Sequence, residues 1–314
     1  MRLRMQVTMG ALTLAGLSLL AIPAARAQEP TEVLMPEQSA ARAKELIQKA
    51  VQALGGREYL GVRDATCEGR VGSFGHSGEL MGYEKFIDYT KLPDKDRSEN
   101  LPKRNIIDVK NGDKGWVLDR GGVSEADQRS IDEFQEDIKT DIDNVLRDRW
   151  KEPGTILRYL GPDVVDLKEA DWIEFVDNEN RSIRIAFAQA THLPLRKVIV
   201  TRDPNTRMRS ETIEYYSNYH PIGGVIQPFQ VTRERNGQKI YQAFIEECKF
   251  NTNPADSLFT KESLEERWQQ VGKKTIRKQE KQKEKQEQSD QEEQKNDQKN
   301  GTSSSGGSSS SSSP

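Results

Sequence analysis

The stretch VIQPFQVTRERNGQKIYQAFIEECKF, residues 225–250, decides the fold class. Two long runs rich in β-branched and aromatic residues, 225–235 and 239–250, flank the dipeptide Asn236-Gly237. Asn-Gly favours the two-residue turn of a β-hairpin, because both residues accept the positive φ that this turn requires. The stretch therefore predicts two long antiparallel strands.

The same pattern fills most of the chain on the N-terminal side of this hairpin. Further candidate strands are residues 65–71, 79–89, 105–110, 116–119, 156–160, 164–167, 172–176, 182–188, 195–201 and 208–219. Short turns such as Asn111–Gly115 join them, and strands do not alternate regularly with helices. We therefore expect roughly ten strands in one antiparallel sheet, which twist should curl towards an incomplete barrel.

Two amphipathic helices are available to cover the concave face of such a sheet. The first begins at Ser39, has one apolar face and ends at Gly55-Gly56. The second runs from Ser124, read as its cap, to Trp150, with an apolar stripe and an acidic opposite face. The predicted class is α+β: a curved antiparallel sheet forming an incomplete, half-open β-barrel covered by amphipathic helices.

The two ends of the chain differ from the middle. Residues 1–27 combine Arg2 and Arg4, an apolar stretch over 9–22 and the small residues Ala25 and Ala27, which is the layout of a cleaved signal peptide. A membrane anchor is the alternative, but the apolar stretch is shorter than the roughly 20 residues of a span. We expect a periplasmic protein with a folded domain over 36–264. Residues 265–314 should form a charged helix or spacer and a disordered Ser/Gly-rich tail.

The sequence contains no recognisable catalytic or metal-binding motif. Its 47 Lys and Arg nearly balance its 50 Asp and Glu, which argues against nucleic acid as a partner. The three histidines, His76, His192 and His220, are isolated, and no nucleophile elbow is present. We therefore expect no catalytic residue, no metal, no cofactor and no enzymatic activity. Cys67 and Cys248 are the only cysteines and either pair as a disulfide or remain two small buried groups.

Several segments together resemble the periplasmic outer-membrane lipoprotein-sorting (LolA-like) superfamily. They are AKELIQKA (43–50), ALGG (53–56), NGDKGW (111–116), THLPLR (191–196), EYYSNY (214–219), GVIQP (224–228) and NPADSLF (253–259). The resemblance implies an incomplete barrel with helices packed as a lid, and carriage of lipoprotein acyl chains or lipids between membranes. The superfamily also includes envelope stress sensors. The acidic second helix and the charged, serine-rich tail depart from the well-known carriers.

The leading functional hypothesis is a periplasmic carrier or binding protein for lipoprotein acyl chains or lipids, with transient membrane contact. Its cleft candidates are Ile131, Phe134 and Ile138 from the second helix, with Ile173, Phe175, Ile183, Ile185 and Phe187 from the strands. The alternative for these side chains is a closed core. The alternative function is an envelope protein-binding or sensor module that uses the same fold without lipid cargo, with envelope proteins as its partners.

Overall fold

The computed structural model describes residues 34–75, 77–202 and 208–270. The predicted signal peptide over 1–27 and most of the predicted tail over 265–314 lie outside these residues, as does His76. The helices are α1 (Pro36–Ala53), α2 (Arg57–Leu60), α3 (Gln128–Thr140) and α4 (Ile142–Arg147), with 3-10 turns η1 (Arg149–Lys151) and η2 (Asp256–Phe259). A further helical segment covers residues 261–270.

One antiparallel sheet of thirteen strands forms the body of the domain. The strands are β1 (Asp64–Phe74), β2 (Leu80–Lys91), β3 (Lys95–Leu101), β4 (Ile107–Asn111), β5 (Lys114–Asp119), β6 (Gly122–Glu125), β7 (Ile156–Val165), β8 (Lys168–Val176), β9 (Ser182–Ala188), β10 (Pro194–Arg202), β11 (Arg209–Ile222), β12 (Val225–Arg235) and β13 (Gln238–Phe250). Their spatial order is β6-β5-β4-β3-β2-β1-β13-β12-β11-β10-β9-β8-β7. The two edge strands, β6 and β7, do not pair, so the sheet stays open, as the sequence predicts.

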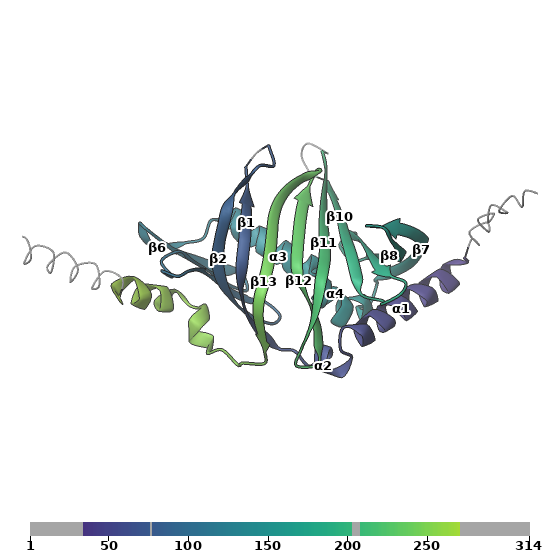
Figure 1. The fold of residues 1–314 in the computed structure, drawn as a ribbon, viewed down its shortest axis with the longest axis horizontal. Helices are drawn as coiled ribbons and strands as arrows, with labels where there is room; N and C mark the ends of the chain where they lie inside the picture. The colour runs from purple at the N-terminus through teal and green to yellow at the C-terminus, as the bar shows by residue number, and fades with distance from the viewer. Residues whose placement is uncertain (1–33, 76, 203–207, 271–314) are drawn as a thin grey trace, which may run out of the picture. The chain divides into compact units, whose positions relative to one another are not determined.

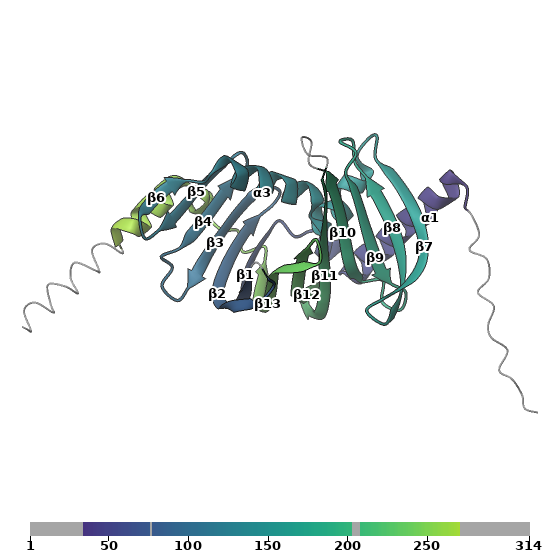
Figure 2. The same cartoon turned by 90° about the horizontal axis from the view of Figure 1, so that it is seen from above.

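The sheet consists of two meanders that meet in its centre. Strands β1–β6 form the first and β7–β13 the second, and the pairing of β1 with β13 joins them (Figure 1). The segment that links the meanders contains α3 and α4, which lie across the concave side of the curved sheet (Figure 2). The predicted arrangement of a half-open barrel with helices over its concave side is confirmed.

Helix α1 closes the concave side of the second meander. Its buried face carries Ala43, Leu46, Ile47 and Ala50, the apolar stripe expected from the sequence. This face packs in one core with strand residues such as Ile173 and Phe187. The helix begins at Pro36, three residues before the predicted start, because proline at the first helical position has no amide hydrogen to leave unpaired.

The second predicted helix is shorter and broken. Ser124, predicted as its cap, lies in the edge strand β6 instead, and Asp127 caps α3 by accepting a hydrogen bond from the Ser130 amide at 2.8 Å. A second break follows at Asp141, whose carboxylate caps α4 through the Asn144 amide at 3.0 Å. Aspartate favours this role because its side chain competes for backbone amides.

Strand β3 was not predicted, because its sequence KDRSENL is almost entirely polar. Arg97 and Glu99 are nevertheless buried and pair at 2.7 Å. The Arg97 guanidinium also donates to the Leu258 carbonyl and the Ser263 hydroxyl, so the C-terminal segment covers this part of the sheet. A small second core forms here from Ile107, Val109, Leu118, Phe259 and Leu264. In the described ranges, no helix is long and apolar enough to span a bilayer.

Candidate functional site

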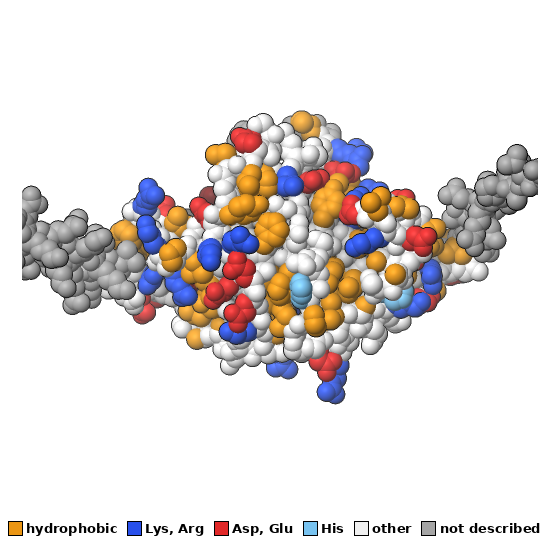
Figure 3. All heavy atoms as spheres, in the orientation of Figure 1, with side chains coloured by type: hydrophobic (Ala, Val, Ile, Leu, Met, Phe, Trp, Pro, Cys, Tyr) orange, Lys and Arg blue, Asp and Glu red, His pale blue; other side chains and the backbone are white. Residues whose placement is uncertain are grey.

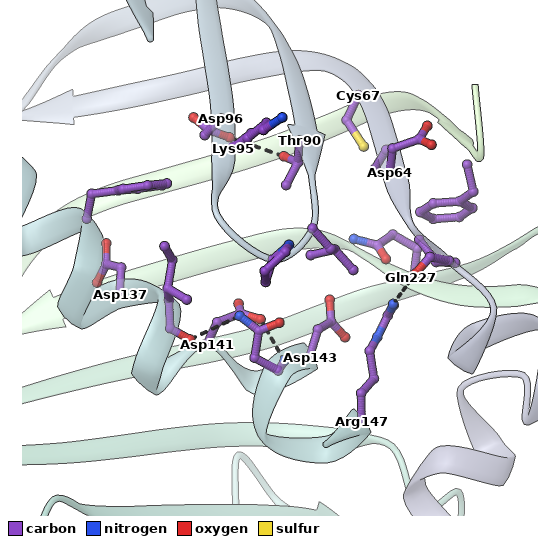
Figure 4. A pocket seen from close by; sticks show the side chains of 18 of the residues that line it. Asp64, Cys67, Thr90, Lys95, Asp96, Asp137, Asp141, Asp143, Arg147 and Gln227 are labelled. Carbon is purple, nitrogen blue, oxygen red and sulfur yellow. Dashed lines mark hydrogen bonds between the residues drawn. The ribbon is translucent and has the colours of Figure 1, made fainter. Parts of the chain in front are cut away.

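Two adjoining cavities, each of about 470 Å³, lie between the α3–α4 segment and the concave face of the sheet. Both are lined by Asp137, Asp141, Asp143, Glu214, Gln227, Arg233 and Tyr241. The shared lining makes them two ends of one hollow, which we call the central cavity. Its walls come from both meanders, because α3 and α4 bridge the place where the meanders meet (Figure 4).

One end of the central cavity is mainly apolar. Leu54 and the α4 residues Ile142 and Leu146 face the sheet there, and the strand residues are Pro194, Tyr216, Tyr219, Pro228, Val231, Ile240, Ala243 and Ile245. Val231 and Ala243 are direct partners in the β12–β13 ladder, so they lie on one face of the sheet. This end combines these apolar side chains with the charged side chains that it shares with the other end.

The other end is rich in ionisable groups. Its acidic side chains are Asp64, Asp96, Asp137, Asp141, Asp143 and Glu214, and its basic side chains are Lys95, Arg147, Lys197 and Arg233. The apolar groups among them include Phe134 and Ile138 of α3 and Phe250 of β13. The central cavity is therefore amphipathic, with an apolar end and a charged end.

A buried ionic cluster fixes the end of α3 to the sheet. Glu214 on β11 pairs with Lys197 of β10 at 2.8 Å and with Arg233 of β12 at 2.7 Å. Lys197 also donates to the Thr140 carbonyl at 2.9 Å, and Arg233 contacts Asp137 at 3.2 Å. We call Lys197, Glu214 and Arg233 the clamp. Burial alone would raise the pKa of Glu214, but Lys197 and Arg233 outweigh it and lower this pKa to about 2.

Helix α4 is fixed separately, at the charged end of the cavity. The Tyr59 hydroxyl donates to Asp143 at 2.5 Å, and the buried Arg147 donates to the Val62 carbonyl at 2.8 Å. The Arg147 guanidinium also lies over the Tyr59 ring, 4.3 Å from its centre. These contacts tie the helix to the connection between α2 and β1.

Three carboxyl groups in and beside the cavity have pKa values above the ordinary value of an aspartate. Burial, reinforced by neighbouring Asp143, raises the pKa of Asp141 to about 6. Burial raises the pKa of Asp96 to about 6 against the hydrogen bond from Thr90. On the adjacent strand, burial and the charge of Asp96 raise the pKa of Asp88 to about 7, and the Asp88 Oδ1 atom has no hydrogen-bond partner among the described residues.

The structure divides the eight predicted cleft residues between two places. Phe134 and Ile138 line the central cavity, and Ile131 is buried. Ile173, Phe175, Ile183, Ile185 and Phe187 lie fully buried in the core beneath α1 and are absent from the cavity lining. The alternation of the strands identified an inward-facing set, but α1 fills the space in front of it.

Neither the clamp residues nor Asp141 are among the site residues predicted from the sequence. A usable signal was present: Lys197 alternates in phase with Ile199, which is buried in the core, and it lies opposite Ile185 in the ladder. A charged residue at an inward position of a strand needs a partner on a neighbouring strand. Glu214 of β11 supplies that partner.

The two cysteines lie opposite each other on β1 and β13, and the structure joins them in a disulfide. This bond connects the two meanders, and Cys67 lies at the margin of the central cavity.

His192 stands in the β9–β10 turn and His220 contacts the Phe229 ring, and neither lines the cavity. Among the described residues, no group of three or more His, Cys, Asp or Glu side chains could hold a metal ion.

Comparisons with known proteins support the fold. A DUF1329 family protein from Desulfovibrio piger matches 71% of this chain and 98% of its own length, with a TM-score of 0.50 and 17% sequence identity. A LolA superfamily protein from Nitrosomonas europaea matches 71% of this chain and 99% of its own, with a TM-score of 0.47 and 11% identity. No family model and no curated protein matches the sequence. The chain is thus similar in fold to the DUF1329 family protein, and its open antiparallel sheet with covering helices is the fold that the LolA-like resemblance implies.

Proposed function

We propose that the protein binds an acyl chain or lipid in its central cavity and carries it in the cell envelope without catalysis. The observation that supports this most directly is the apolar end of the cavity, between α4 and the concave faces of β11–β13. Its volume of about 470 Å³ falls in the range of about 300–1,000 Å³ that is usual for small-molecule sites. Each buried CH₂ group would contribute about 0.8 kcal/mol to binding.

The signal peptide predicted over residues 1–27 fits this role, because it would deliver the carrier to the periplasm. The cargo's apolar chain would lie along Val231, Ala243 and Ile245. Its polar group would then face the ionisable end, where the basic side chains of Lys95 and Arg147 lie. The clamp would hold α3 as a fixed roof, and cargo would enter and leave beside it.

The ionisable end favours a second candidate function, the binding of a peptide segment of an envelope protein. Six acidic and four basic side chains line that end, which is more charge than a hydrocarbon chain can use. Backbone amides and basic side chains of a peptide could pair with Asp96, Asp141 and Asp143. In this case the apolar end would take one or two large side chains.

Filling the apolar end tests the carrier proposal. Ala243→Trp places an indole in that end, and Glu246→Trp on the same strand is the matched control, because Glu246 is exposed and forms only a surface ion pair with Arg70. A fluorescent fatty-acid probe should bind to the wild type and to the control, and its affinity should fall at least about tenfold in Ala243→Trp. Equal affinity in all three proteins, or no binding to any, would exclude the apolar end as a lipid site.

A further inference from the structure

Exposed hydrophobic side chains gather at one end of the central strands. Leu80 is 47% exposed, Met81 69%, Tyr83 48% and Ile240 38%. They lie at the start of β2 and of β13, next to the β1–β2 and β12–β13 turns. The ladders place Leu80 opposite Phe74 and Tyr241 opposite Ser73, so these residues occupy three neighbouring strands. We call Phe74, Leu80, Met81, Tyr83 and Ile240 the apolar tip.

Two side chains of the apolar tip, those of Leu80 and Tyr83, lie together on the surface of the sheet. The rings of Tyr83 and Phe244 meet edge to face, with 5.9 Å between their centres. Leu80 and Tyr83 both lie over Gly72, which has no side chain to separate them. Figure 3 shows hydrophobic side chains gathered over this part of the convex face. A contiguous exposed patch of this kind marks an interaction surface, whereas single exposed residues do not.

The charges around the apolar tip are mainly positive. Arg202, Arg209, Arg235 and Lys239 lie at the same end of the sheet as three carboxylates, Glu79, Glu211 and Glu234, of which Glu234 is opposite Lys239 in the ladder. Glu211 is paired with Arg209, and Glu79 accepts a hydrogen bond from Ser77. Within the described part of the chain, Arg235 and Lys239 have no carboxylate partner, and the Lys239 ammonium lies 5.6 Å from the centre of the Phe74 ring. Exposed apolar side chains beside the two unpaired cations Arg235 and Lys239 suit an anionic lipid surface.

The apolar tip also continues into the central cavity. Ile240 belongs to both, since it is exposed at the tip and lines the apolar end of the cavity. Its neighbours along β13, Tyr241, Ala243 and Ile245, line the same end. Ile240 is skipped in the β12–β13 register, so this bulged residue stands between the exposed tip and the cavity residues of β13.

We propose that the apolar tip docks on the surface of an anionic lipid bilayer, with the side chains of Met81 and Ile240 inserted among the acyl chains and Arg235 and Lys239 against the headgroups. The purpose of this docking rests on the proposed carrier function. A docked protein could pass an acyl chain along β13 between the bilayer and the central cavity without exposing it to water. The docking itself can be measured without any cargo.

The β7–β8 turn provides a matched comparison within the same protein. Val164 is 63% exposed there and Leu167 98%, so each is more exposed than Leu80, Tyr83 and Ile240 of the tip. However, its neighbours are three carboxylates, Asp163, Asp166 and Glu169, against the two cations Lys168 and Arg196, and Asp166 pairs with Arg196. The negative charge should keep this turn away from an anionic surface. A substitution of Val164 therefore controls for the general loss of exposed hydrophobic area.

The experiment is co-sedimentation of the mature protein with vesicles of phosphatidylcholine alone or of phosphatidylcholine and phosphatidylglycerol in equal parts. We expect the wild type and Val164→Glu to bind the anionic vesicles equally. The double variant Met81→Glu/Ile240→Glu should bind at least about tenfold more weakly, since two charged groups cannot insert. Arg235→Glu/Lys239→Glu should bind more weakly and lose most of the salt dependence of the wild type.

Three results would overturn the docking proposal: no binding of the wild type to anionic vesicles, unchanged binding of the Met81→Glu/Ile240→Glu variant, or an equal loss in Val164→Glu. If the tip instead joins two copies of the chain, the Met81→Glu/Ile240→Glu variant will sediment as a monomer where the wild type is a dimer, without any difference on vesicles. Fatty-acid probe binding in the same preparations separates the two proposals. Retained probe binding without vesicle binding rejects docking alone, whereas vesicle binding without probe binding rejects the carrier function alone.

Discussion

Two regions of the concave face of the sheet differ in how they are filled. The inward residues Ile173 and Phe175 of β8 and Ile185 of β9 are apolar, and α1 and α4 pack in one core with them. Where β1–β3 and β11–β13 face α3 and α4, the inward residues are mixed, and the central cavity remains. The same curved sheet therefore has a filled region and a hollow region.

The difference follows from which side chains the covering helices present. The inner face of α1 carries Leu46 and Ile47, which are large enough to fill the space above β8 and β9. The end of α3 is instead held by the clamp, whose long charged side chains keep helix and sheet apart. Stability should depend mainly on the filled region and ligand binding on the hollow one.

The largest expected effect is the truncation of a phenylalanine in the filled region. Phe175→Ala removes a fully buried ring and should lower the free energy of unfolding by about 3–5 kcal/mol. Phe134→Ala, in the hollow region, removes a ring that lines a cavity and should lower it by less than about 1 kcal/mol. Urea unfolding measures both values. Equal losses would mean that the two regions are packed alike.

Breaking the clamp should have the next largest effect. Glu214→Gln leaves Lys197 buried without a counter-charge, and the half-buried Arg233 keeps only Asp137, so this change should lower the free energy of unfolding by about 3 kcal/mol. Arg158→Gln removes an exposed partner of Glu174 and should change it by less than about 1 kcal/mol. Amide exchange in α3 should accelerate only in the first variant. Unchanged exchange there would contradict the role of the clamp in holding the roof.

The carboxyl groups of the first meander should make stability depend on pH. The pKa of Asp88 is about 7 in the folded protein but about 4 in an unfolded chain. Between these values the folded protein binds more protons, so this group's contribution to stability falls as the pH rises and is fully lost above about pH 7. Asp88→Asn should therefore stabilise the protein at pH 7.5, by about 1–2 kcal/mol more than at pH 5. Thermal unfolding at the two pH values would refute this if the difference were absent.

The smallest effect concerns a cavity residue and appears in binding. Ile138→Ala should lower the affinity for the fatty-acid probe about fourfold, since roughly one CH₂ contact is lost. The unfolding midpoint should stay close to that of the wild type. Ile131→Ala is the matched control, because Ile131 is buried on the same helix but does not line the cavity. A control that weakened the probe equally would place the binding site elsewhere.

The helices and strands could be predicted from the sequence more reliably than the way in which they pack against one another. The turns at Asn111–Gly115 and Asn236-Gly237 give strong local signals, and both hairpins form as expected. The helix break at Asp141 is equally local, but the continuous apolar stripe of the segment concealed it. Strand β3 could not be predicted, because the partners of Arg97 and Glu99 come from the C-terminal segment, far away in the sequence.

The candidate site shows the same limit. Alternation identified Ile173, Phe175 and Phe187 as inward residues, but only the packing of α1 decides that they face a core. Phe134 and Ile138 have the same apolar spacing and line a cavity, because the clamp holds their helix away from the sheet. The clamp joins β10, β11 and β12 to α3. Contacts between residues this far apart in the sequence cannot be predicted from the spacing of apolar residues.

The most direct test of the central claim, that the hollow region holds a lipid or acyl chain, is native mass spectrometry of the mature protein purified from the envelope of its own cells. The account predicts a second mass, released on organic extraction, that corresponds to a lipid or an acylated peptide and is much reduced in Ala243→Trp. A single mass without bound ligand, unchanged when lipid is added back, would contradict it.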